Sequence, residues 1–190
     1  LSIHRICQQY GIQLVAEWVP REENELADYY SKIVDADDWS VNPVVFEWLD
    51  EEWGPRTLDC FASVSTRKTD RYCSRWWNPG CVAVDAFTFP WEGENVWLTP
   101  PLYLIGKVIK MVEFYECHAT LIVPKWVSAA WWPLLFRGTS WCSFVKECID
   151  IPLRDDTFLQ GTCPWNLFGK GTPKCKVLAI RLCTVARCKC

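Results

Sequence analysis

The sequence predicts an α/β protein whose mostly parallel sheet carries helices on both faces. Residues 82–87 and 95–98 have the character of short strands, and residues 119–124 form a continuous apolar run of the kind found in parallel strands that are buried on both sides. Between the last two segments, apolar residues recur at spacings of three and four, which indicates one face of a helix. A strand, a helix and a second strand in this order form the unit from which parallel sheets are built.

The N-terminal part predicts one strand and one helix. Residues 12–18 alternate partly between polar and apolar side chains, and Pro20 ends this expected strand. Asn24 is a favourable N-cap for a helix that begins at Glu25. Asp28 falls on the first turn of that helix, where the helix dipole favours an acidic side chain. A role as a helix-start charge therefore stands beside any functional role for Asp28.

A second helix and a short strand are expected after an acidic linker at residues 35–41. Asn42 caps this helix and Gly54, followed by proline, ends it. Residues 57–63 then predict a short buried strand in which Asp59 is the single charge. Because burial of an unpaired charge is costly, we expect Asp59 to meet a polar partner at the strand end.

Residues 64–80 look irregular and interleave basic with aromatic side chains. Two interpretations fit this pattern. The aromatic rings stack on the bases of a single-stranded nucleic acid, or the arginines pack over aromatic rings of the core, which is the more frequent arrangement in a tryptophan-rich protein. The basic and aromatic side chains of residues 64–80 are Arg67, Lys68, Arg71, Tyr72, Arg75, Trp76 and Trp77.

The apolar run at residues 82–87 has the acidic residue Asp85 near its end.

The stretch 95–102 changes from a strand pattern to a helix pattern. We expect a strand at residues 95–98 and a helix from Pro101 to Glu116. Proline cannot donate a ladder hydrogen bond, but it suits the first turn of a helix. In an open α/β sheet such a junction lies at the carboxyl edge, where ligands bind. The turn at residues 99–101 therefore either lines a pocket or simply ends a strand and begins a helix.

The C-terminal third predicts three further strands and one helix. Residues 119–124 form the first strand, and residues 126–136 form a helix that is interrupted or kinked at Pro133. Two late strands are expected at residues 142–148 and 175–182, separated by a loop rich in glycine and proline.

Composition restricts the class of protein. With 190 residues, half of them hydrophobic and 13 of them tryptophan, the chain can form one core domain with an additional fragment. No apolar run approaches the ~18 residues that span a bilayer, and no signal peptide is visible. The first residue is Leu1, which suggests an excerpt from a longer polypeptide.

The 12 cysteines are irregularly spaced and include no Cys-x-x-Cys pair. We therefore expect reduced thiols and an intracellular protein, located in the nucleus or the cytoplasm. Cys183, Cys188 and Cys190 offer thiolates near the C-terminus, and a zinc site there is the minor alternative because the segment lacks histidine.

Charge is distributed unevenly along a chain whose net charge is −3. Residues 1–53 carry 12 acidic and 3 basic side chains, whereas residues 157–190 carry 6 basic side chains and no acidic one. The basic C-terminal part either contacts phosphates or forms a solvated sheet edge, where lysine and arginine are common.

The expected N-terminal helix carries a sequence motif that is more specific than a general helix-start pattern. Val19-Pro20, then Asn24-x-x-Ala27-Asp28, then Ser31-Lys32 resemble the last strand and helix of retroelement RNase H domains. The resemblance implies that Asp28 is the last of the carboxylates that hold two Mg²⁺ ions at the scissile phosphate. Lys32 stands where that family has arginine, and the earlier carboxylates would precede Leu1. With one carboxylate, this segment is expected not to cleave RNA.

A second, ordered series of motifs covers most of the remaining chain. The series resembles the Dam-like adenine methyltransferase domain of phages and of DIRS-type, tyrosine-recombinase retrotransposons. In those elements the domain directly follows reverse transcriptase and RNase H, which is the order expected here. The motifs are Leu58-Asp59-Cys60-Phe61-Ala62-Ser63, Asp85-Ala86-Phe87, Trp91, Val96-Trp97-Leu98-Thr99-Pro100-Pro101 and Leu121-Ile122-Val123-Pro124.

The resemblance assigns roles to the turn after the central strand. In the family, an Asn/Asp-Pro-Pro-Tyr motif accepts hydrogen bonds from the target adenine and stacks an aromatic ring on the flipped base. Thr99 would stand for Asn/Asp, Pro100 and Pro101 for the prolines, and Leu102 for the aromatic residue. Threonine offers one hydroxyl acceptor and leucine has no aromatic face. Loss of stacking alone is worth ~1–3 kcal/mol, so the base-binding motif is degenerate.

The methyl group in this family comes from S-adenosylmethionine. By resemblance, Asp59, Phe61 and Asp85 are the candidates for contact with this cofactor, although no Gly-x-Gly turn follows the strand at residues 57–63. Mg²⁺ is expected only in an intact RNase H domain.

We therefore expect four segments. Residues 1–34 would end an RNase H-like domain, and residues 35–41 would form the linker. Residues 42–184 would form a Rossmann-like, methyltransferase-like domain, and residues 185–190 a basic tail that contains cysteines.

The expected function is that of a retroelement polyprotein fragment with a degenerate, nucleic-acid-associated methyltransferase-like domain and weak or no catalysis. The alternatives are an active S-adenosylmethionine-dependent DNA adenine methyltransferase, and an RNase H/reverse transcriptase relic without independent activity. Expected partners are DNA or an RNA–DNA hybrid and the upstream reverse transcriptase and RNase H segments, with no membrane.

Overall fold

The computed structural model describes residues 3–15, 17–18, 20, 39–160, 168 and 171–185. The chain divides into two compact units, Leu1–Val34 and Asp35–Cys190. The first unit contains helix α1 (Ile3–Tyr10), which the sequence patterns did not predict.

The strand predicted at residues 12–18 is wrong for the described positions, which form no regular secondary structure. Partial alternation does not create a strand where no partner strand is described to share its hydrogen bonds. Asp28 and the helix predicted around it lie outside the described residues, as does the tail from residue 186 onward.

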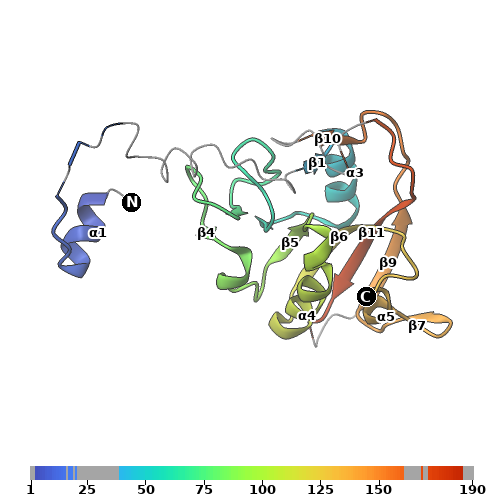
Figure 1. Ribbon diagram of the computed structural model, residues 1–190. Coiled ribbons are helices and arrows are strands. Elements are labelled where there is room, and N and C mark those ends of the chain that lie inside the picture. The colour runs from blue at the N-terminus through green and yellow to red at the C-terminus, as the bar shows by residue number, and fades with distance from the viewer. Residues whose placement is uncertain are drawn as a thin grey trace. The chain divides into compact units, whose positions relative to one another are not determined.

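The second unit is a mixed α/β domain built on a five-stranded mixed sheet (Figure 1). Strands β2, β5 and β6 run parallel, whereas β11 is antiparallel to both of its neighbours, β6 and β9. The sheet is therefore less parallel than the sequence predicted, because the last strand along the chain reverses direction. In spatial order the strands are β2 (Leu58–Asp59), β5 (Asn95–Leu98), β6 (His118–Pro124), β11 (Val177–Cys183) and β9 (Val145–Asp150).

A short parallel pair, β3 (Cys73–Ser74) and β4 (Ala83–Val84), lies beside β2. A single parallel bridge between Asp59 and Tyr72 connects this pair to the larger sheet. The spatial order is thus β4-β3-β2-β5-β6-β11-β9. Strands of two residues leave no periodic signal, which explains why β3 falls in a region predicted to be irregular.

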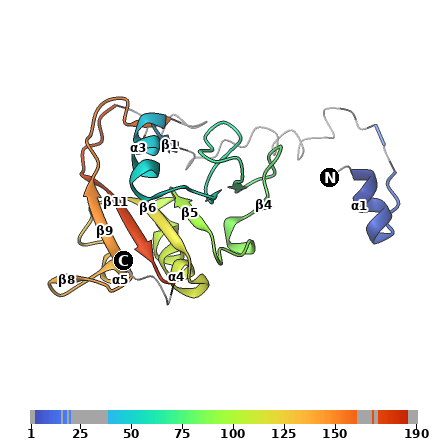
Figure 2. The ribbon, with the colours of Figure 1, turned by 180° about the vertical axis from the view of Figure 1, so that it is seen from behind.

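Helices α4 (Ile105–Tyr115) and α3 (Pro43–Trp53) pack on opposite faces of the sheet. Successive side chains of a strand point to opposite faces; accordingly, Val96 and Leu98 pack with α4, whereas Trp97 packs with α3. In Figure 1 α4 lies in front of the strands, and in Figure 2, from behind, β6 and β11 lie in front of α4. The strand at residues 95–98 and the apolar helical face after it are confirmed.

The start of α3 is also confirmed. The Asn42 side chain accepts a hydrogen bond from the Val44 N–H (3.0 Å), and Pro43 occupies the first turn. Just before it, Trp39–Val41 form the buried strand β1, which pairs with β10 (Phe158–Gln160). Residues 39–41 are therefore not linker, because their apolar side chains bury despite the preceding acidic run.

The helix predicted at residues 126–136 is mostly wrong. Only α5 (Trp132–Leu135) is helical, and turns precede it. Pro133 occupies the start of α5 instead of kinking a longer helix, because it can donate no backbone hydrogen bond. A hairpin of β7 (Phe136–Arg137) and β8 (Ser140–Trp141) follows directly.

Candidate functional site at the carboxyl edge of the sheet

The sequence-predicted site residues of the second unit leave the sheet at one edge. Because β2, β3, β4 and β5 run parallel, the segments that follow them all emerge at the carboxyl edge. Phe61 follows β2, Asp85 follows β4 and Thr99 follows β5. Asp59 lies opposite Trp97 in the sheet register, and Phe61 and Thr99 each follow this last pair by two residues. The carboxyl edges of α/β sheets are where ligands bind.

The Thr99–Leu102 turn presents little polar surface to this edge. Thr99 is 4% exposed, and Pro100 is buried beside it. Leu102 is half-buried and packs against the hydrophobic clusters on both faces of the sheet. The neighbouring Tyr103 is 66% exposed. Thr99 and Leu102, which would hold a base by resemblance, therefore pack within the protein. For Leu102 the reason is that burial of an apolar side chain is favourable.

The loop after β2 has its backbone donors engaged within the protein. Four consecutive N–H groups, those of residues 60–63, donate to protein acceptors. Each residue of this loop also carries a side chain, so its backbone cannot approach a ligand as closely as a glycine turn does. The acceptors are, in order, the Trp97 carbonyl (3.1 Å), Asp59 Oδ1 (3.4 Å), the Cys73 carbonyl (3.1 Å) and Thr66 Oγ1 (2.8 Å).

Asp59 acts inside the protein and is 1% exposed. Besides the Phe61 N–H, its carboxylate accepts a hydrogen bond from the Lys68 N–H at 3.0 Å. The expected polar partner is thus the backbone of its own loop. Burial lowers the pKa of the Lys68 ammonium, and the Asp59 charge partly counteracts this by raising it. Asp59 is not placed to contact a cofactor directly.

Asp85 is the exposed acid of the edge and has a strained backbone. Its φ of 66° lies in the left-handed region, where a non-glycine residue costs of order 1–3 kcal/mol. Several bonds hold it there: its N–H donates to the Ser74 carbonyl (2.8 Å), and its carboxylate accepts from the Phe87 N–H (3.0 Å). Backbone strain of this kind is found at functional sites. Because Asp85 is exposed and Asp59 is 1% exposed, Asp85 is also the more accessible of the two predicted cofactor-side acids.

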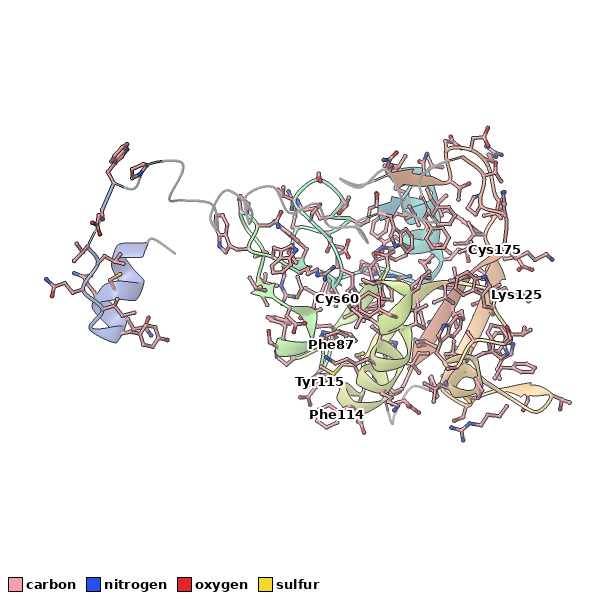
Figure 3. The ribbon with its side chains drawn as sticks, in the orientation of Figure 1. Cys60, Phe87, Phe114, Tyr115, Lys125 and Cys175 are labelled. Atoms are coloured by element: carbon pink, nitrogen blue, oxygen red, sulfur yellow. The ribbon has the colours of Figure 1, made fainter. Side chains whose placement is uncertain are left out.

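The sequence analysis did not identify Lys107, a cation that lies beside the aromatic rings near the carboxyl edge. Lys107 Nζ lies 3.6 Å from the centroid of the Phe87 ring, and the Phe61 ring lies edge-on to Phe87 at 5.8 Å. Lys107 occupies an exposed position early in α4, where lysine is ordinary, so helical spacing gave no signal. Figure 3 labels Phe87 and Cys60 on this side of the molecule.

A buried cation, Arg56, lies at the opposite, amino edge, where its charge acts on the half-buried His118. Arg56 is 7% exposed, donates to the Leu49 carbonyl (3.1 Å), and leaves Nε and Nη1 without a partner. Burial lowers the pKa of Arg56 to about 10, although Asp50 opposes this effect. Burial, together with Arg181 and Arg56, lowers the pKa of His118. These groups do not contribute to the carboxyl edge.

Two buried thiols, Cys60 and Cys117, are not activated nucleophiles. Burial, the neighbouring Cys73 and the Asp59 charge raise the pKa of Cys60. Burial raises the pKa of Cys117 to about 12. A thiol of raised pKa carries little thiolate at neutral pH and reacts slowly. The described cysteines are free thiols: Cys7, Cys60, Cys73, Cys81, Cys117, Cys142, Cys148, Cys175 and Cys183.

The residues at the carboxyl edge fit S-adenosylmethionine poorly. The loop after β2 presents engaged N–H groups and side chains where a glycine turn would be needed, and Asp59 is committed to that loop. The exposed Asp85 and the half-buried Phe61 and Phe87 remain at this edge. In the part of the chain that the structure describes, no three or more His, Cys, Asp or Glu side chains group in a way that could hold a metal ion.

Comparison with known proteins adds no assignment: no family model matches the chain, and no curated protein matches it. Among the described helices, none has the length and apolar character needed to cross a membrane.

Proposed function

We propose that the second unit is a degenerate, methyltransferase-like domain of a retroelement polyprotein that associates with nucleic acid and has little or no catalytic activity. The carboxyl edge supports this proposal most directly. It has a proline turn at the expected strand end, but Thr99 is buried, Leu102 packs against both hydrophobic clusters, and the N–H groups of residues 60–63 after β2 are engaged within the protein.

The strand order supports the methyltransferase-like part of the proposal. Numbered along the chain, the strands of the sheet lie in the order 3-2-1-4-5-7-6, from β4 to β9. Doubly wound nucleotide-binding folds share the order 3-2-1-4-5 and bind ligands beside the switch from strand 1 to strand 4. Here that switch lies between β2 and β5, next to Phe61 and Thr99. The antiparallel β11 distinguishes this sheet from an all-parallel dinucleotide-binding sheet.

The alternative of an active adenine methyltransferase requires groups that this edge lacks. Catalysis depends on interactions that strengthen in the transition state. A buried threonine and an inward leucine supply neither the acceptors nor the aromatic face for an extruded adenine. The same geometry leaves room for a domain that retains the fold and associates with nucleic acid.

Calorimetry on the intact chain tests the proposal. We expect no saturable heat on titration with S-adenosylmethionine at millimolar concentration. Saturable binding that Phe61→Ala abolishes and Phe114→Ala leaves unchanged would refute the degenerate assignment. Phe114 is a suitable control because it lies at the far end of α4 from this edge (Figure 3). Methyl transfer to adenine-containing DNA would then establish the active alternative.

The retroelement assignment has a separate test. The genomic sequence upstream of the codon for Leu1 is expected to encode reverse transcriptase and the remaining RNase H carboxylates. The isolated chain is expected not to cleave an RNA–DNA hybrid in the presence of Mg²⁺. Hybrid cleavage that Asp28→Asn abolishes would show that the first unit is active without those segments.

A further inference from the structure

Two adjacent tryptophans stand in solvent at the same carboxyl edge. Trp76 is 45% exposed and Trp77 is 75% exposed, and both directly follow β3. Other large rings of the second unit, such as Trp91 and Trp97, are at most 1% exposed, whereas Tyr103 and Phe114 are exposed singly. Exposure of two neighbouring indole rings loses the free energy of burying them, of order 2–3 kcal/mol for one large side chain. An exposed aromatic pair of this kind indicates a binding surface.

The loop that carries the pair is tied down, so the exposure is a property of the folded domain. The Asn78 side chain donates to Ser74 Oγ (2.9 Å) and to the Trp76 carbonyl (3.2 Å), and it accepts from the Val64 N–H (3.1 Å). The Tyr72 hydroxyl donates to the Pro79 carbonyl at 2.6 Å. Because these bonds fix the backbone on both sides of the pair, its rings are held ready for contact at a reduced entropic cost.

Basic side chains outnumber acidic ones in the loop that carries the pair. Arg75 is exposed, and its guanidinium carbon lies 5.5 Å from the centroid of the Trp76 ring. Residues 64–80 contain 4 basic side chains and a single acid, Asp70, which lies 3.6 Å from Arg67. The net charge of residues 64–80 is therefore positive, whereas that of the whole chain is −3. A partner with negative charge and flat, stackable rings matches both features.

We propose that Arg75, Trp76 and Trp77 form a binding site for single-stranded nucleic acid, in which the indole rings stack on bases and Arg75 contacts phosphate. Stacking of successive bases on aromatic rings, combined with nearby arginine, is the recognition mode of proteins that bind single strands without sequence preference. Two other basic residues of the loop have partners within the protein: Arg71 pairs with Glu94 at 2.8 Å, and Arg67 packs over Tyr72. The site deepens the proposed function by naming the partner class, but it requires neither cofactor binding nor methyl transfer.

Fluorescence anisotropy of a labelled single-stranded oligonucleotide with the intact chain, without S-adenosylmethionine, tests the site. We expect binding at low salt with an affinity tighter than ~100 μM, the weak limit of non-specific association. Trp77→Ala is expected to weaken binding roughly 5- to 100-fold, and Trp77→Phe to retain most of it, because either ring can stack. Arg75→Gln is expected to lower the slope of log affinity against log salt by about 0.7, the contribution of one phosphate contact on a single strand.

Phe114→Ala is the matched control. Phe114 is also 75% exposed but lies at the end of α4, at the amino edge of the parallel strands. This variant is expected to bind as the unchanged chain does. Equal weakening by Phe114→Ala and Trp77→Ala, or no binding by the unchanged chain at low salt, would overturn the proposal.

Sedimentation analysis of the same variants distinguishes a protein interface from a nucleic-acid site. Val64, Val82 and Val84 extend the exposed apolar surface, so a second copy of the chain is the competing occupant. If Trp77→Ala dissociates an oligomer and leaves oligonucleotide binding unchanged, the surface joins copies of the chain and the nucleic-acid proposal is wrong. Because binding is measured without cofactor, failure of this site leaves the calorimetric test of the proposed function unaffected.

Discussion

Asp59→Asn provides the sharpest test of the local role of Asp59. The substitution keeps the shape of the side chain but replaces one carboxylate oxygen with an NH₂ group, which faces a backbone N–H of Phe61 or Lys68. A hydrogen bond to a charged group contributes about 1.5–3 kcal/mol, and a buried donor left without a partner adds to the loss. We therefore expect the free energy of unfolding to fall by about 2–3 kcal/mol, equivalent to roughly 4–12 °C in Tm for a domain of this size.

Asp85→Asn is the control because Asp85 forms the same local bond in a different environment. Each carboxylate accepts from the N–H two residues ahead, but Asp59 is 1% exposed whereas Asp85 lies in solvent. Asparagine retains the acceptor and tolerates a positive φ, so Asp85→Asn is expected to change stability by less than ~0.5 kcal/mol.

Urea unfolding followed by tryptophan fluorescence measures both variants. All but one of the 13 tryptophans lie beyond Val34, so the signal reports mainly on the second unit. Equal midpoints for the two variants would refute the argument from burial. An Asp59→Asn variant with unchanged stability that loses a measurable affinity for S-adenosylmethionine would restore Asp59 as a cofactor ligand.

Three further predictions concern other parts of the second unit. Arg56→Met is expected to raise the free energy of unfolding by about 1–3 kcal/mol in urea titrations, because it removes a buried charge with unpartnered Nε and Nη1 atoms; a loss of stability would show that the Leu49 carbonyl bond outweighs desolvation. Glu116→Gly is expected to stabilise by about 1 kcal/mol, because Glu116 ends α4 at a φ of 49° that glycine adopts without strain, and an unchanged thermal midpoint would contradict this. The lowered pKa of His118 means that the unfolded chain binds a proton more readily; stability is therefore fully present above pH 6.5 and decreases as the pH falls through the folded-state pKa. His118→Gln should flatten this dependence in unfolding experiments between neutral and mildly acidic pH, and an identical pH profile would rule out His118 as its source.

Residues 95–124 were the most predictable part of the fold, for a local reason. The change of period at Thr99 specified β5 and α4, and the apolar face from Ile105 to Val112 is buried as spacing requires. The capped start of α3 was predictable for the same reason, since Asn42 and Pro43 act on their own neighbours. Such elements are determined within a few residues.

What could not be predicted depends on distant partners. Strands β3 and β10 contain two and three residues and exist only because β4 and β1 lie beside them. The direction of β11 also follows from its pairing with β6 and β9, which no local pattern encodes. At the site, the parallel order of the strands, which the sequence predicted, places Phe61, Asp85 and Thr99 at one edge of the sheet. The sequence could not show that Asp59 is bonded to its own loop, or that Lys107 covers Phe87.

Under the proposed methyltransferase-like assignment, the fold and base binding place different requirements on the proline turn after β5. Pro100 is buried and Leu102 joins the clusters on both faces, so apolar side chains at this edge improve packing between α3, α4 and the sheet. A base-binding motif places the opposite demand on the same positions, because its acceptor and ring must remain available to a ligand. Thr99 at 4% exposure and a half-buried Leu102 that packs on both clusters satisfy the first requirement at the expense of the second. If Trp76 and Trp77 bind a single strand, contact with nucleic acid resides on the β3 loop, whose exposed rings contribute little to the core. Loss of methyl transfer would then leave nucleic-acid binding intact, and this outcome can be measured independently of any cofactor.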